Sequence, residues 1–128
     1  MRHLLPIDIP ATLRRNKPVE QFLGRSPVDP TYIRHIELRP ANDSIEVWIH
    51  DVEDIGSEDF SDLYEFPNFE PDGPEAPAAI SPDAASAVTY ASTFLAADPD
   101  RWTNLGIAES DYLDYIRAGR PPGWPVAS

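Results

Sequence analysis

Apolar and polar residues alternate most regularly between residues 44 and 50. This period of two predicts a strand with one face on the core. The side chains expected to face the core are Ile45, Val47 and Ile49. A second alternating run, 32–38, comes before it and is expected to stop at Pro40. One face of this predicted strand holds Tyr32, Arg34, Ile36 and Leu38. Asn42 and Asp43 are turn formers, so the two runs predict an antiparallel hairpin.

A third alternating run covers residues 60–66, which we interpret as another antiparallel strand. Ser57, followed by Glu58 and Asp59, could equally open a short helix there. Two helices are predicted further on. The first begins at Ser81-Pro82-Asp83 and runs to about Ala97, because serine can cap a helix and proline suits its first turn. The second opens at Ser110 and ends at Gly119.

The remaining segments are rich in proline, of which the chain has 15. We expect residues 1–30 to be an irregular N-terminal segment with room for one short helix over 18–23, ending at Gly24. Residues 67–80 read as a Pro-rich connection. The sequence therefore predicts one α+β domain spanning 1–128, in which an antiparallel sheet of three to four strands is packed by two C-terminal helices.

Charge is distributed unevenly along the 128 residues, whose formal net charge is −12. Between Pro40 and Asp100 there are fifteen acidic residues and no lysine or arginine. The negative electrostatic field of this segment repels nucleic acid and anionic lipid, and it attracts basic proteins. Cysteine is absent, and no apolar run is long enough for a signal peptide or a membrane span. We therefore expect a cytoplasmic protein that binds neither nucleic acid nor membrane.

Seven carboxylates fall within residues 51–65, with no basic residue nearby in the sequence. They repel one another when they share a surface, and a cationic partner relieves that repulsion. Aromatic residues in the same region supply the anchors that interface hot spots use, although solvation of the charges and core packing of the aromatics are the plain alternatives. The predicted partner-binding residues are Trp48, Asp51, Glu53, Asp54, Glu58, Asp59, Asp62 and Tyr64.

Catalytic and metal-binding interpretations fit less well. The acidic residues from Asp51 to Asp62 match the spacing of a calcium loop poorly, because Ile55 occupies a ligand position and the closing glutamate is missing. His50 and Asp51 are neighbours in a strand, so they point to opposite faces, and His50 is expected to face water. We predict no enzyme activity, no cofactor and no metal. A small carboxylate-dependent hydrolase stays open as an alternative.

Several stretches resemble small bacterial immunity proteins of contact-dependent growth inhibition and related polymorphic toxin systems. They are residues 46–54, 62–67, 102–107 and 111–115. The resemblance implies an acidic protein that binds and neutralises a cognate toxin domain with a basic surface, often a nuclease, by occlusion in the cytoplasm of the producing cell. A regulatory or adaptor module that binds another basic protein is the alternative within the same class of binding protein.

Overall fold

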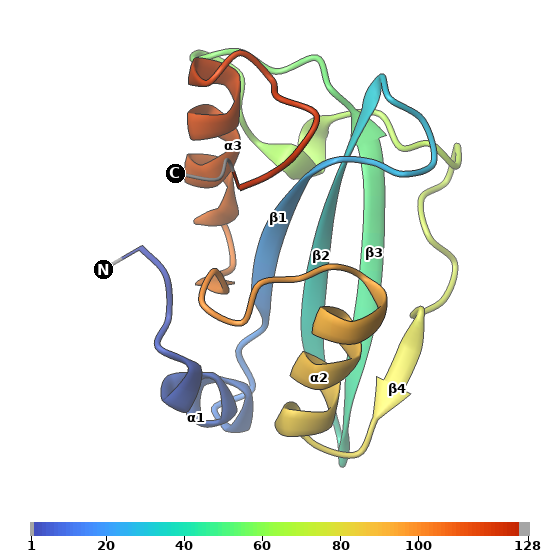
Figure 1. Cartoon of the computed structure of the whole chain (residues 1–128). Coiled ribbons are helices and arrows are strands. Elements are labelled where there is room, and N and C mark those ends of the chain that lie inside the picture. Colours follow the sequence, from blue (N-terminus) through green and yellow to red (C-terminus); the bar gives the residue numbers. More distant parts are fainter. Residues whose placement is uncertain (1, 126–128) are drawn as a thin grey trace.

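Five antiparallel strands form one open sheet in the computed structural model, which describes residues 2–125 (Figure 1). The strand order is β4-β3-β2-β1-β5. The strands are β1 (Val19–Arg25), β2 (Tyr32–Ala41), β3 (Ser44–Glu53), β4 (Ala79–Ser81) and β5 (Thr103–Asn104). The predicted α+β class and the antiparallel sheet are confirmed, but the sheet has more strands than the three to four expected.

The predicted hairpin is the centre of this sheet. β2 and β3 pair from Tyr32 opposite Glu53 to Ala41 opposite Ser44, and the two turn residues Asn42 and Asp43 join them. Asn42 has φ 53°, a left-handed conformation that asparagine tolerates. Pro40 does not stop β2. The pairing of β1 with β2 begins only at Leu38, so the missing N–H of Pro40 faces no strand on that side.

The N-terminal segment is more regular than predicted. A 3-10 turn, η1 (Pro6–Asp8), leads into the short helix α1 (Ile9–Arg14). The helix expected over 18–23 is wrong, because these residues belong to β1, which lies between β2 and β5. Both faces of β1 are covered, so it lacks the alternation that marks a half-exposed strand. Gly24 follows a register shift in the pairing with β2, at φ 89°, and ends no helix.

The strand expected over 60–66 is also wrong. Ser57 and Phe60 form an isolated bridge, and the 3-10 turn η2 (Leu63–Glu65) follows, with Asp62 accepting a hydrogen bond from the Tyr64 N–H. Leu63 and Phe66 are buried. The two buried residues are three positions apart, a spacing that places both side chains on the same side of a 3-10 turn. The alternating pattern of this segment therefore does not reflect a strand. No helix opens at Ser57, and the fourth strand, β4, comes at the end of the Pro-rich connection.

The two C-terminal helices are confirmed with changed ends. They are α2 (Ala84–Phe94) and α3 (Ala108–Arg117), and Gly119 follows α3 at φ 86°. Ser81 does not cap α2, because it pairs with Ile45 in β4; the cap is Asp83, whose carboxylate accepts a hydrogen bond from Ser86 N–H. No helix within residues 2–125 combines the length and the apolar character needed to cross a bilayer.

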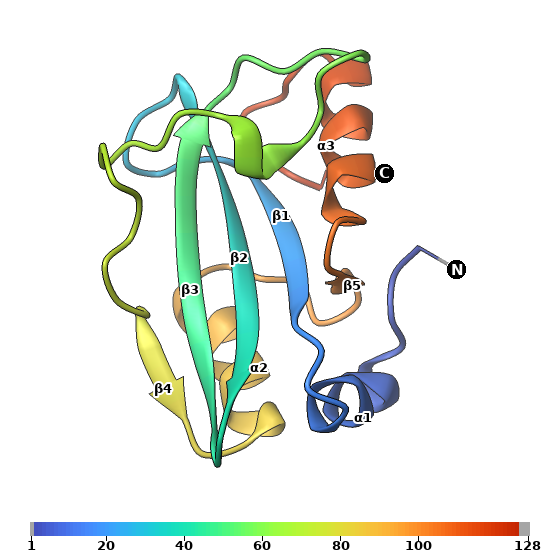
Figure 2. The same cartoon turned by 180° about the vertical axis from the view of Figure 1, so that it is seen from behind.

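Two apolar clusters hold the layers together. Figures 1 and 2 show these layers from opposite sides. One face of the sheet packs against α1 and α2, where Trp102 and the alanines of α2 meet the aliphatic side chains of β2 and β3. The other face is covered at one end, where α3 packs against β1 and the segment around η2 packs against the end of β3. Figure 2 shows that no helix covers the remainder of this second face.

Candidate functional site

The predicted partner-binding residues do not share one surface. Trp48 pairs with Glu37 and points to the face of the sheet that is partly uncovered. Asp51 and Glu53 are separated from Trp48 by an odd number of positions in β3, so their side chains point to the opposite face of the sheet. The other members lie after β3, in the segment that crosses the end of the sheet.

Three of the predicted carboxylates are bound by arginines from outside the acidic middle of the chain. Asp51 accepts hydrogen bonds from Arg34 at 2.8 and 3.0 Å and from the Ser26 hydroxyl at 2.7 Å. Asp54 pairs with Arg120 and accepts a hydrogen bond from the Tyr112 hydroxyl. Glu58 pairs with Arg117 at 2.7 and 3.0 Å. The expected cluster of seven carboxylates without a cation is therefore wrong for Asp51, Asp54 and Glu58.

Many of the unpaired carboxylates lie in the connection between β3 and β4, residues 54–78, which we call the acidic connection. It runs over the end of the sheet and down beside β3 (Figure 1, green to yellow). Within residues 2–125, six exposed carboxylates of this connection make no salt bridge. They are Asp59, Asp62, Glu65, Glu70, Asp72 and Glu75. Phe60, Tyr64 and Phe69 are exposed between them by 38%, 46% and 45%.

Tyr64 also covers a cluster of buried ionisable residues that the sequence did not reveal. The polar cluster consists of Glu20 on β1, His35 and Glu37 on β2, and His50 on β3. Strand neighbours bring them together, since Glu20 lies opposite Glu37 and His35 lies opposite His50. The Tyr64 ring meets the two imidazole rings edge-on, at centroid distances of 4.9 and 5.5 Å.

The two histidines are stacked with their ring centroids 4.7 Å apart. The prediction that His50 faces water is wrong: its Nε2 lies 3.4 Å from a Glu37 carboxylate oxygen, and its side chain is 12% exposed. His35 is fully buried and neither of its ring nitrogens has a hydrogen-bond partner. Burial, together with the charge of His50, lowers the pKa of His35 to about 3, so His35 is neutral at pH 7.

The two buried glutamates have opposite pKa shifts. Burial raises the pKa of Glu20, against the hydrogen bonds that it accepts from Tyr64, Ala108 and Gly106. Burial also acts to raise the pKa of Glu37, but hydrogen bonds from His50 and the Arg39 guanidinium outweigh it and lower that pKa to about 2. The hydroxyl of Tyr64 donates to Glu20 at 2.7 Å, and burial beside that carboxylate raises the tyrosine pKa.

Trp48 borders the polar cluster on the uncovered face. Its indole N–H donates to Glu46 at 3.0 Å, and the Arg39 guanidinium lies 4.4 Å from the ring centroid. The tryptophan is therefore held in place by a hydrogen bond and a cation–π contact. A side chain that is fixed in advance loses little conformational entropy when a partner covers it.

Acid–base chemistry requires that a substrate reach the ionisable groups. Glu20, His35 and Glu37 are exposed by only 1%, 0% and 5%, so these three side chains lie beneath the surface. In the part of the chain that the structure describes, no group of three or more His, Asp or Glu residues is arranged to hold a metal ion.

No protein-family model matches this sequence, and neither the curated proteins nor the solved structures contain a significant match.

Proposed function

We propose that this protein binds a basic protein through the acidic connection, and that its partner is a toxin domain which it neutralises by occlusion. The observation that carries the proposal is the set of six exposed carboxylates without a salt bridge, in a connection of 25 residues that has no lysine or arginine. Three exposed aromatic side chains lie among them.

Charge and aromatic residues have separate roles in this proposal. Unpaired carboxylates on one connection attract a basic protein over several ångströms and raise its association rate, most strongly at low salt. Phe60, Tyr64 and Phe69 supply apolar contact area once the partner has arrived. The bond between Tyr64 and Glu20 fixes one of these anchors relative to the sheet. The pair of Asp54 with Arg120 attaches the start of the connection to the end of the described chain.

The choice of a toxin as partner rests on the resemblance to immunity proteins and on one physical argument. A domain that acts on nucleic acid needs a basic surface, and an acidic protein can cover that surface as phosphate does. An adaptor that binds some other basic protein would use the same connection, so only the identity of the partner separates the two functions. Residence in the cytoplasm, where an immunity protein acts, is part of the proposal.

The test uses the product of the neighbouring gene, which we expect to be a large secreted protein with a basic C-terminal domain. That domain and this protein should form a complex, and co-expression should protect cells from its toxicity. A neighbouring gene that encodes no such protein, or a toxic domain that this chain does not bind, would contradict the proposal.

Charge reversal tests the surface within that complex. The double variant Glu65→Lys/Glu70→Lys should slow association at low salt by about tenfold or more, because steering depends on the local field. The control Asp8→Lys/Asp100→Lys makes the same change in net charge at two exposed carboxylates outside the connection. Equal association rates for the two double variants would remove the acidic connection from the mechanism.

A further inference from the structure

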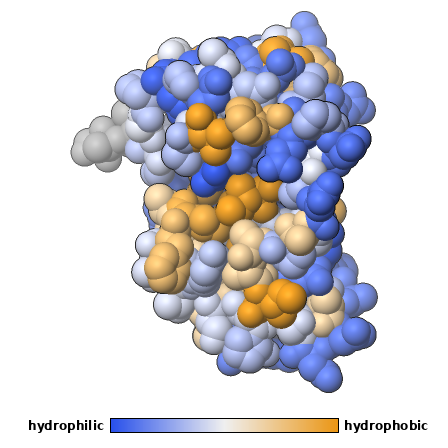
Figure 3. All heavy atoms as spheres, turned by 90° about the vertical axis from the view of Figure 1, so that its right-hand side faces the viewer, coloured by the Kyte–Doolittle hydropathy of each residue, from blue (hydrophilic) through white to orange (hydrophobic). Residues whose placement is uncertain are grey.

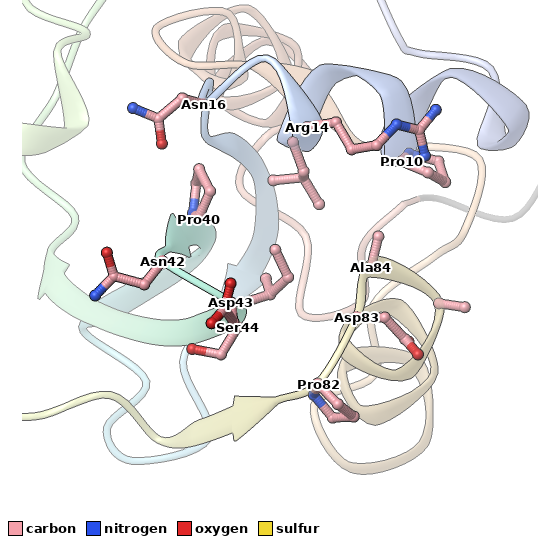
Figure 4. A pocket seen from close by; sticks show the side chains of 13 residues that line it. Pro10, Arg14, Asn16, Pro40, Asn42, Asp43, Ser44, Pro82, Asp83 and Ala84 are labelled. Carbon is pink, nitrogen blue, oxygen red and sulfur yellow. The ribbon is translucent and has the colours of Figure 1, made fainter.

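A cleft of about 540 Å³ opens where α1, the tip of the β2–β3 hairpin and the start of α2 meet (Figure 4). The hairpin tip and α1, which line it, lie at the opposite end of the sheet from η2 (Figure 2). Its volume is in the range of sites that bind small molecules. The cleft is thus separate from the part of the acidic connection that crosses the end of the sheet.

The floor and walls of the cleft are mostly apolar. Leu13 and Ile45 line it and belong to the buried core, with exposures of 4% and 8%. Pro10 of α1, Pro40 of β2 and Pro82, between β4 and α2, add rigid walls. A ligand with an apolar body can therefore remove water from this surface without a large change in the protein.

Two carboxylates stand on opposite walls of the cleft, Asp43 at the hairpin tip and Asp83 at the start of α2 (Figure 4). Within the described chain, Asp43 makes no salt bridge and no side-chain hydrogen bond, so its charge is free. Hydrogen bonds from Ser86 hold the pKa of Asp83 below its usual range, so this group stays ionised. Arg14 also lines the cleft, but its side chain extends along α1 toward Pro10 (Figure 4).

We propose that this cleft binds a small organic cation with an apolar body, a free alkylguanidinium or alkylammonium compound. The apolar part lies on Leu13 and Ile45, and the cationic head is drawn to Asp43. The proposal does not depend on the partner proposed for the acidic connection.

An anion is the main competitor for the same cleft. The first N–H groups of α2 and the guanidinium of Arg14 attract negative charge. Asp83, however, already caps this helix end with its own carboxylate, at 2.8 Å from Ser86 N. Two carboxylates against one guanidinium leave the cleft net negative, which favours the cation.

The experiment is a titration of the ¹⁵N-labelled full chain with four probes that share a butyl group: butylguanidinium, butylammonium, butyrate and butanol. We expect saturable amide shifts at Asp43, Ile45 and Ala84 with the two cations, and much weaker ones with butanol and butyrate. Shifts that are as large with butyrate or butanol, that fall on the acidic connection, or that do not saturate would overturn the proposal.

Asp43→Asn keeps a turn-forming residue in the hairpin and removes the charge. It should weaken butylguanidinium binding by about tenfold or more, because the neutral amide no longer attracts the cationic head as the carboxylate does. Asp72→Asn, at an exposed carboxylate in the acidic connection, is the matched control and should leave binding unchanged. Equal affinity in both variants would overturn the role of Asp43.

A blocked arginine, N-acetyl-arginine methylamide, separates a free ligand from the side chain of a protein. The free compound should bind more tightly, because it has no backbone to place at the mouth of the cleft. Tighter binding of the blocked arginine would overturn the free-ligand assignment and make the cleft a contact for a basic protein.

Discussion

The two faces of the sheet bury different chemistry. Beneath α1 and α2 the core consists of aliphatic side chains, alanines and one tryptophan, and it is held together by the area that it removes from water. The other face adds ionisable residues, Glu20, His35 and Glu37, to an aromatic cluster around Tyr112. Its contacts depend on direction and protonation state, so the two faces should respond differently to mutation and to pH.

This difference between the two faces matters for the acidic connection, because hydrogen bonds and an ion pair on the second face hold the connection against the sheet. Tyr64 is bound to Glu20, and the Tyr112 hydroxyl accepts a hydrogen bond from the Gly56 N–H at 2.9 Å. Arg120 donates to the Gly56 carbonyl at 2.7 Å and pairs with Asp54. Burial and the bond to Asp54 raise the pKa of Tyr112 to about 12. The proposed binding surface is thus attached to the face whose contacts depend on pH.

Leu38→Ala should cause the largest loss of unfolding free energy, and it tests only the face of the sheet beneath α1 and α2. Leu38 is fully buried, and such truncations cost about 2–5 kcal/mol of unfolding free energy. Urea denaturation at several pH values measures it. The loss should be the same at pH 7 and pH 5; a loss that varies with pH would mean that the two faces are not independent.

Glu20→Gln should cost less, about 1–3 kcal/mol at pH 7, because its amide cannot accept every hydrogen bond that the carboxylate accepts. The cost should grow on acidification, because the pKa of Glu20 is higher in the folded protein than in the unfolded chain. The folded wild type therefore takes up the proton first and gains stability, which the variant does not. A urea series from pH 7 to pH 4 measures both. A variant as stable as the wild type at pH 7 would show that these bonds do not hold the connection.

His35→Phe should change the pH dependence of stability. The pKa of His35 is about 3 in the folded protein and about 6.5 in the unfolded chain, so the unfolded chain binds the proton first. Stability therefore falls as the pH drops from 6.5 toward 3, by at most about 1.4 kcal/mol per pH unit. Glu37, with a folded pKa of about 2, adds a further loss only below pH 4.5.

The variant should remove the part of this slope between pH 6.5 and 4.5, where Glu37 contributes little. Thermal unfolding at fixed salt across that window, with Leu38→Ala as the control on the other face, measures the change. An unchanged slope in His35→Phe would show that His35 is not the residue that senses acid.

Arg117→Gln should cause the smallest loss of stability. Its pair with Glu58 is exposed, and exposed ion pairs contribute little because water and salt screen them. Urea midpoints for this variant and for Arg34→Gln, whose pair with Asp51 is largely covered, provide the comparison. Equal losses in the two variants would contradict the distinction between the exposed and the covered pair.

Local patterns predicted the features that a single segment can specify. The hairpin of β2 and β3 follows from alternation and two turn residues. The start signal around Asp83 predicted α2, and the stop at Gly119 predicted the end of α3. β1 was missed because both of its faces are covered, and its identity as a strand depends on pairing with β2 and β5. The run at 60–66 had the alternation of a strand, yet no neighbouring strand was there to pair with it.

For the candidate site too, some features follow from the sequence and others only from the tertiary structure. The sequence by itself determined that the negative charge is concentrated between Pro40 and Asp100, because composition along a chain does not depend on folding. Only the tertiary structure decided which charges are free: arginines 17, 59 and 66 residues away bind Asp51, Glu58 and Asp54. Strand register likewise decided that Glu20, His35, Glu37 and His50 are buried together, because contacts between distant residues form only when the strands pair.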